Sequence, residues 1–259
     1  MNEPPSSSGY TPADPFGRQP AQPYGAPPVQ RQRVARRPVV TLALIAITVL
    51  VFAAQLLSEA VFGTDIPALY GAKINEAILA GQFWRLLTPV LLHGSILHIA
   101  FNMYALYVIG SGLETYYGPT RYLLLYLVSG FAGNVFSFLF SANPSLGAST
   151  AVFGLVAAEG VFVFQNRFLF RNPRGVLTNI LMIVAVNLFL GLSPGIDNWG
   201  HLGGLFGGVA VAWFGGPRYE VNNLLGSYHV EDTRETQGMW ITAAGVTLFF
   251  ALLAYTRFL

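Results

Sequence analysis

The sequence predicts an all-α membrane protein with seven membrane-spanning helices. Of its 259 residues, 53% are hydrophobic and only 10% are charged, whereas soluble domains carry about a quarter charged residues. The apolar residues gather in stretches of about 20, which is the length of helix that crosses a hydrocarbon core of roughly 30 Å. These stretches are continuously apolar rather than alternating, and this favours helices over the strands of a membrane barrel.

The hydropathy pattern also sets the order of the segments. Residues 1–37 are rich in Pro, Gly, Ser and Gln, a composition that buries too little apolar surface to fold, so we expect a disordered cytoplasmic tail. A six-helix membrane domain over 38–216, a cytoplasmic linker over 217–237 and a seventh helix over 238–259 follow. The expected spans are about 39–58, 95–114, 121–140, 149–166, 176–193, 200–215 and 239–257. The first is longer than the apolar part of a signal peptide, so we interpret it as a retained span.

The basic residues predict the orientation in the membrane. Eleven of the fourteen Lys and Arg residues lie in the tail or in loops on the same side as the tail. The positive-inside rule therefore places the amino terminus in the cytoplasm and the carboxy terminus outside. A net charge of only +2 gives no sign of nucleic-acid binding. Residues 59–94, on the outer side, are too apolar for a solvated linker, so we expect a structured segment partly in the outer leaflet.

Four polar residues inside the spans need an explanation, because polar groups are costly in a membrane. His98 and Asn102 are four residues apart on the second span, so they share a helix face. Ser149 begins the fourth span and His201 begins the sixth. The predicted topology places all four toward the outer half of the membrane. His93 is five residues before His98, and regular helix geometry would turn it to a different face.

These residue types in this arrangement are typical of acyl transfer. The free N–H groups and the dipole of a helix start stabilise negative charge that forms beside Ser149. His201 can take the proton of the serine hydroxyl, and His98 and Asn102 can donate hydrogen bonds to an oxyanion. Each residue also has a structural interpretation: Ser149 in helix packing, His201 at the membrane interface and Asn102 bonded to a carbonyl of another helix.

Several motifs occur in order over residues 83–216, about half of the chain. They are Trp84-Arg85, His93-x4-His98-x3-Asn102 with Gly112-x-Glu114, Gly147-Ala148-Ser149-Thr150, and Gly200-His201-x-x-Gly204-x-x-x-Gly208. The last contains a GxxxG pattern, which lets helices approach closely. The ordered set resembles the rhomboid intramembrane serine proteases. Two positions depart from the family pattern, because Thr150 replaces the commoner Gly and Gly200 replaces the commoner Ala.

The resemblance implies a rhomboid-like six-helix bundle with one additional carboxy-terminal helix. It also implies a catalytic dyad of Ser149 and His201 without a third carboxylate. In this comparison Phe153 is the aromatic residue on which the dyad histidine packs.

The remaining residues of the motifs have supporting roles by the same resemblance. His98, Asn102 and the backbone around Ala148 would hold the oxyanion, and Gly147 would keep the loop close to the scissile carbonyl. Trp84 and Arg85 would hold the external segment, and Glu114 would form a helix–helix contact.

The activity that the resemblance implies is that of an intramembrane serine endopeptidase. Its substrates would be single-span membrane proteins, cut near the outer membrane boundary, and it would need no metal or cofactor. The carboxy-terminal position of the extra helix favours a bacterial plasma membrane.

Three other functions are compatible with parts of this pattern: an inactive rhomboid-like protein that binds membrane-protein clients, a small-solute transporter, and a zinc intramembrane protease. The zinc enzyme requires His-Glu-x-x-His, and no histidine in this sequence has another four residues later.

Overall fold

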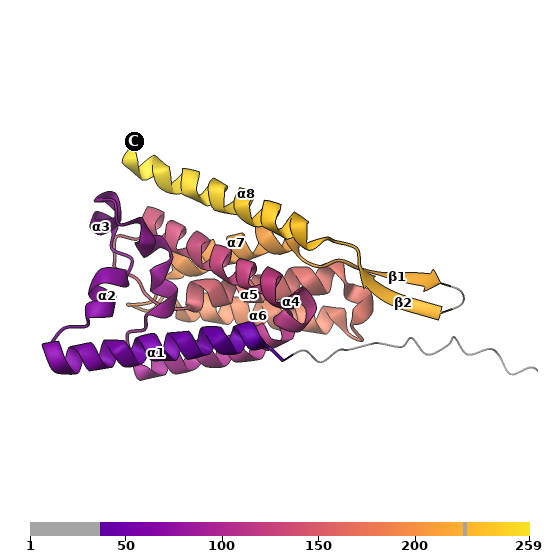
Figure 1. The fold of residues 1–259 in the computed structure, drawn as a ribbon, viewed down its shortest axis with the longest axis horizontal. Helices are drawn as coiled ribbons and strands as arrows, with labels where there is room; N and C mark the ends of the chain where they lie inside the picture. The colour runs from indigo at the N-terminus through magenta and orange to yellow at the C-terminus, as the bar shows by residue number, and fades with distance from the viewer. Residues whose placement is uncertain (1–36, 225–226) are drawn as a thin grey trace, which may run out of the picture.

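The computed structural model describes residues 37–224 and 227–259, and its fold is all-α apart from one hairpin, in agreement with the fold class predicted from the sequence (Figure 1). The expected tail over 1–37 therefore lies, except for Arg37, outside the described residues. The long helices are α1 (Val39–Phe62), α4 (Ile96–Phe140), α5 (Ser149–Gln165), α6 (Pro173–Leu190), α7 (Asn198–Gly215) and α8 (Thr236–Tyr255). The hairpin consists of β1 (Tyr219–Leu224) and β2 (Ser227–Asp232), which pair antiparallel.

Short helices fill the remaining segments. The stretch between α1 and α4, expected to be structured, contains α2 (Ile66–Gly71), α3 (Asn75–Leu79) and the 3-10 helices η1 (Phe83–Leu86) and η2 (Thr88–Leu91). Two further 3-10 turns, η3 (Arg167–Leu169) and η4 (Thr256–Phe258), follow α5 and α8.

Four of the described helices, α1, α4, α6 and α8, are long and apolar enough to cross a membrane. Helix α4 has 45 residues and covers two of the predicted spans. It is broken at Gly118, whose φ of 74° is favourable only for glycine, and Pro119 follows. A Cβ at Gly110 would lie 2.2 Å from the hydroxyl of Tyr122, so the two arms of α4 fold back on each other.

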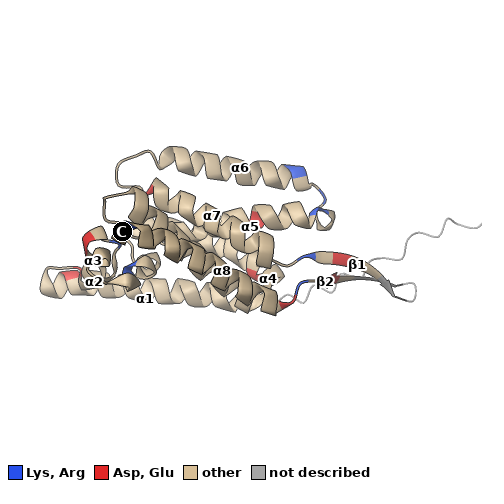
Figure 2. Ribbon diagram, turned by 90° about the horizontal axis from the view of Figure 1, so that it is seen from above, with Lys and Arg blue, Asp and Glu red and all other residues tan. Residues whose placement is uncertain are grey.

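The helical body has two distinct ends (Figure 1). Helices α2 and α3 and the carboxy terminus lie at one end, which we call the α2–α3 end, and the hairpin projects from the other. Coloured charged residues gather near these two ends, and the helices between them are almost entirely uncharged (Figure 2). That distribution fits a body whose middle lies in hydrocarbon, where charges are costly.

Helices α5 and α7 touch through their backbones. A Cβ at Gly204 would lie 2.0 Å from the carbonyl oxygen of Thr150, and one at Gly208 would lie 2.2 Å from that of Gly154. The GxxxG pattern of α7 therefore allows the close approach that such small residues favour. Helix α5 is buried along most of its length, whereas α6 buries only Ile180.

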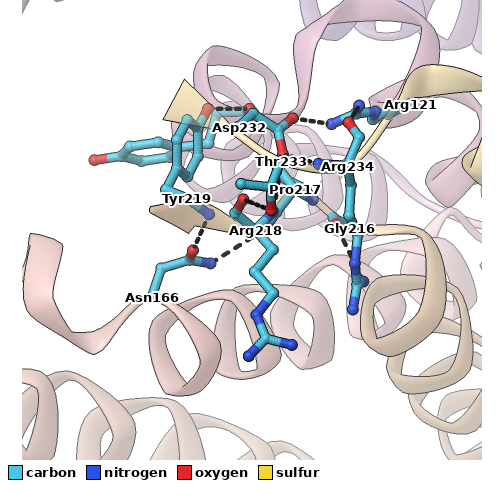
Figure 3. Close-up of polar contacts among 10 residues, drawn as sticks. Arg121, Asn166, Gly216, Pro217, Arg218, Tyr219, Asp232, Thr233 and Arg234 are labelled. Atoms are coloured by element: carbon cyan, nitrogen blue, oxygen red, sulfur yellow. Dashed lines mark hydrogen bonds and ion pairs between the residues drawn. The ribbon is translucent and has the colours of Figure 1, made fainter. Parts of the chain in front are cut away.

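The base of the hairpin is fixed to three helices (Figure 3). Arg121 of α4 forms an ion pair with Asp232. Asn166, which follows α5, donates to the carbonyl of Pro217 at 3.2 Å and accepts the N–H of Tyr219 at 2.8 Å. Arg234 donates to the carbonyl of Gly216, at the end of α7. The segment expected as a linker over 217–237 thus carries the hairpin and is anchored at its base.

Arg85 and Trp84 hold the external segment together. The Arg85 guanidinium donates to the carbonyls of Ala72 and Leu69, each at 2.7 Å. The Trp84 indole N–H donates to the carbonyl of Tyr70 at 2.9 Å. The motif therefore fixes α2 beside η1, at the end of the body where α4 begins.

Glu114 fastens the start of α1 to α4. Its carboxylate accepts the backbone N–H groups of Val40 and Thr41, each at 2.8 Å, and the Thr41 hydroxyl at 2.7 Å. The first N–H groups of a helix have no acceptor within the helix, so a buried carboxylate there is stabilising.

We expect Glu114→Ala to lower the free energy of unfolding by about 2–4 kcal/mol, because it leaves buried donors without an acceptor. Thermal unfolding in detergent measures the loss. The matched control is Glu59→Ala, which removes an exposed carboxylate near the other end of α1. Equal unfolding temperatures for the two variants would contradict the prediction.

Candidate active site

Ser149 and His201 meet at the α2–α3 end of the body. Ser149 is the first residue of α5, and His201 lies in the first turn of α7. The His201 Nε2 atom is 3.0 Å from the Ser149 Oγ atom, which is within the range of a nucleophile–base hydrogen bond. The structure thus brings together two side chains 52 residues apart in the chain.

Phe153 orients the His201 ring. The two rings are stacked, with centroids 4.2 Å apart and planes 8° from parallel. Phe153 lies one turn after Ser149 on the same helix, so α5 supplies both the hydroxyl and the surface on which the imidazole rests. His201 Nδ1 is buried, and no side chain in the described ranges 37–224 and 227–259 accepts a hydrogen bond from it. Among the described residues, the Phe153 ring rather than a carboxylate is therefore the group that fixes the orientation of the imidazole.

Gly147 brings His98 close to the serine. Gly147 has a φ of +135°, and a Cβ there would lie 2.8 Å from His98 Nε2 and 3.6 Å from Ser149 Oγ. The backbone N–H of Gly94 donates to His98 Nδ1 at 3.4 Å. A neutral imidazole that accepts at Nδ1 carries its proton on Nε2. In the tautomer that this contact favours, the nitrogen beside Gly147 is a hydrogen-bond donor.

The Asn102 side chain and the Ala148 backbone N–H have different hydrogen-bond partners. The Asn102 side chain is buried one turn after His98, and its Nδ2 donates to the carbonyl of His98 at 3.0 Å. The backbone N–H of Ala148 is directed at His93 Nε2, at 3.4 Å. The N–H groups of Ser149 and Thr150, in the first turn of α5, have no acceptor within the helix by its geometry.

His93 joins the site, contrary to the expectation from helix periodicity. Its ring packs edge-on to that of His98, with centroids 5.0 Å apart. The expectation was wrong because α4 begins only at Ile96, after the cap residue Ser95, so helical spacing does not apply to residue 93. Gln55 of α1 fixes the His93 backbone, accepting its N–H and donating to its carbonyl.

His93 gives the protein a predicted dependence of stability on pH. Burial lowers the pKa of His93 from 6.5 to about 4. Between these values the unfolded chain binds a proton that the folded chain does not, so stability falls as the pH drops from 6.5 toward 4. The loss is on the order of 3 kcal/mol. Unfolding measured at pH 7 and at pH 4.5 checks it, and the uncharged His93→Gln should show a smaller difference; an equal difference would contradict the assignment.

Asp197, which the sequence did not point to, supports the start of α7, where His201 lies. Asp197 caps α7: its Oδ1 accepts the N–H of Gly200 at 3.0 Å, and its carbonyl accepts that of His201 at 3.1 Å. An Asp just before a helix start is a recognised cap signal, so sequence could have indicated it.

Lys73 ties the external segment to the loop before Ser149. Its buried Nζ donates to the carbonyls of Ser141 and Asn143, at 2.9 and 2.7 Å, and its backbone pairs with Ser145. Burial lowers the pKa of Lys73 to about 8. No pattern around Lys73 points to these contacts, which come from distant parts of the chain.

Comparison with known proteins gives a consistent result. A Rhomboid domain model matches residues 80–218, more than half of the chain. The Rhomboid protease GluP of Bacillus subtilis (strain 168) is 42% identical over 177 residues, which are 68% of this chain and 34% of that protein. RHOMBOID-like protein 4 of Arabidopsis thaliana is 41% identical over 144 residues, 55% of this chain and 36% of that protein.

The chain therefore spans about a third of the length of these curated relatives. The family match itself is not confined to one motif, since it runs from η1 through α7 and includes the helices that carry Ser149 and His201. With a family model that covers more than half of it, this multi-pass membrane protein belongs to the rhomboid family.

Proposed function

We propose that this protein is an intramembrane serine endopeptidase that cleaves single-span membrane proteins near the outer membrane boundary. The observation that carries the proposal is the 3.0 Å contact between Ser149 Oγ and His201 Nε2 at one end of the helical body. The relation to a protein named as a rhomboid protease supports the same activity. In this proposal Ser149 is the nucleophile and His201 the general base.

The proposed reaction follows from the geometry. His201 Nε2 accepts the proton of the Ser149 hydroxyl as Oγ attacks the scissile carbonyl carbon. The carbonyl oxygen becomes an oxyanion, which His98 Nε2 and the free N–H groups at the start of α5 stabilise, with Asn102 as a further donor. Imidazolium then gives its proton to the leaving amine. Water, activated by His201 in turn, hydrolyses the acyl-enzyme and restores the serine.

We further propose that the α2–α3 end faces the outside of a bacterial plasma membrane. The support is the topology predicted from the sequence, which assigns eleven of the fourteen basic residues to the cytoplasmic side and the segment that contains α2 and α3 to the outer side. The amino terminus is then cytoplasmic and the carboxy terminus outside.

Proteolysis in liposomes tests the proposed function. The full chain is reconstituted with a panel of single-span proteins that differ in the residues at the outer boundary, with and without EDTA. We expect cleavage of some of them near that boundary, at the same rate in EDTA, because serine and histidine need no metal for this chemistry. Mass spectrometry of the products locates the cut.

The competing function is that of an inactive protein that binds membrane-protein clients. A folded chain that co-purifies with panel members but cuts none of them would favour it. Cleavage that disappears in EDTA would instead contradict the serine mechanism.

A further inference from the structure

Thr150 and Gly200 lie against each other beside the proposed dyad. Thr150 directly follows Ser149 and is 4% exposed. Gly200 directly precedes His201. A Cβ at position 200 would lie 3.0 Å from the Cγ2 atom of Thr150, a distance at which one of the two must move. Each partner of this contact is thus covalently next to one member of the proposed dyad.

Thr150 is closely packed on two sides. On the α4 side, a Cβ at Gly133 would lie 2.5 Å from Thr150 Cβ and 2.6 Å from the Gly200 carbonyl. On the α7 side, a Cβ at Gly204 would lie 2.0 Å from the Thr150 carbonyl. Thr150 is therefore packed against three glycines, Gly133, Gly200 and Gly204. Threonine is also stiff at χ1 because it is branched at Cβ.

The other neighbour of position 200 is more adaptable. A Cβ at Gly200 would lie 2.9 Å from Asp197 Oδ2 and 3.1 Å from Asp197 Cγ, and Oδ2 is the carboxylate oxygen that does not make the cap bond. The carboxylate can turn by a small angle, whereas the Thr150 methyl cannot. An added methyl at position 200 would therefore push α7 away from α5.

We propose that residues 150 and 200 are a size-coupled positioning pair that sets the separation of Ser149 and His201. The Thr150 methyl occupies the space that a side chain at position 200 would need, so Thr with Gly, or a smaller residue with Ala, gives the same helix spacing. This inference rests on the proposed function. A displacement of about 1 Å at a catalytic centre can lower the rate by about 100-fold, so the side chains of the pair would control activity through the spacing of Ser149 and His201.

A set of variants that differ by single methyl groups tests the pair. The full chain in detergent is compared with Gly200→Ala, Thr150→Ser, Thr150→Val and the two double variants that combine Gly200→Ala with each change at 150. Serine removes Cγ2 and keeps the hydroxyl, whereas valine keeps Cγ2 and replaces the hydroxyl with a second methyl. The readouts are the second-order rate of labelling by a fluorophosphonate probe, kcat and KM for a cleaved protein, and the unfolding temperature.

We expect Gly200→Ala to slow labelling by about 10- to 100-fold and to lower kcat with little change in KM. Adding Thr150→Ser should restore labelling to within about threefold of wild type, and adding Thr150→Val should restore nothing. The matched control is Gly245→Ala in α8, where a Cβ meets no atom within 4 Å; it should label like wild type.

Each contrary result has a distinct meaning. Labelling of Gly200→Ala at the wild-type rate would overturn the pair while leaving the proposed function intact. A labelling defect of Gly200→Ala that Thr150→Ser and Thr150→Val relieve equally would also overturn the pair. A defect that neither change relieves would do the same. If Gly200→Ala does not fold, recovery of the unfolding temperature by Thr150→Ser but not by Thr150→Val supports the pair, and equal recovery overturns it. A folded wild-type chain that never labels would overturn the proposed function and this inference with it.

Discussion

Ser149→Ala will eliminate covalent labelling by a fluorophosphonate probe, and His201→Ala will reduce it to the background of the denatured chain. The probe reacts with a serine whose hydroxyl loses its proton to a base as it attacks, and in the proposed mechanism that base is His201, 3.0 Å from the hydroxyl. Losses of about 10⁴- to 10⁶-fold are typical when either member of such a unit is removed. Gel fluorescence after timed incubation measures the rate.

The matched control for the serine is Ser145→Ala. Ser145 lies in the same loop, four residues before Ser149, and pairs with Lys73 only through its backbone. It should label at the wild-type rate. Labelling that survives Ser149→Ala would identify another nucleophile, and labelling that survives His201→Ala would show that a different group takes the proton. The double variant should be no worse than either single one, because the two residues act as one unit.

The architecture was largely predictable because it depends on local patterns. Long apolar stretches indicate spanning helices whatever they pack against, and α1, both arms of α4, α6 and α8 lie where hydropathy placed them. The Gly204–Gly208 pattern likewise predicts close packing, since small residues are what such contacts require. The hairpin over 219–232 gave no comparable signal. Its base is held by Arg121 and Asn166, which are far away in the chain.

The sequence pointed to residues that lie together in the structure, but not to the contacts that support them. Ser149, His201 and Phe153 occupy motif positions, and the structure brings them together. Lys73 acts through backbone carbonyls more than 65 residues away, so no spacing rule reveals it. For His93 helical spacing gave a wrong expectation, because this residue precedes the first residue of α4. The conformation of a loop depends on contacts with distant residues rather than on periodicity, so it cannot be predicted from sequence spacing alone.

Gly147→Ala will lower the labelling rate by about 10²- to 10³-fold while the protein stays folded. The new Cβ would lie 2.8 Å from His98 Nε2, so either the imidazole or the loop must move. In the proposed mechanism His98 Nε2 donates a hydrogen bond to the oxyanion, and loss of one such donor typically lowers the rate by about this factor. The φ of +135° adds strain, because residues with a Cβ rarely adopt it. Labelling kinetics and kcat measure the loss, which should appear in kcat rather than KM.

Gly81→Ala separates the two causes. Gly81 also has a positive φ, of +94°, but a Cβ there meets no atom within 4 Å. It lies in the external segment between α3 and η1, and the substitution introduces backbone strain without a clash at His98. We expect a lower unfolding temperature and a labelling rate close to wild type. If Gly81→Ala and Gly147→Ala slow labelling equally, general strain explains the loss and the assignment of His98 to the oxyanion loses its support. If only Gly147→Ala does so, the effect arises from the contact between Gly147 and His98, where the glycine leaves room for the donor.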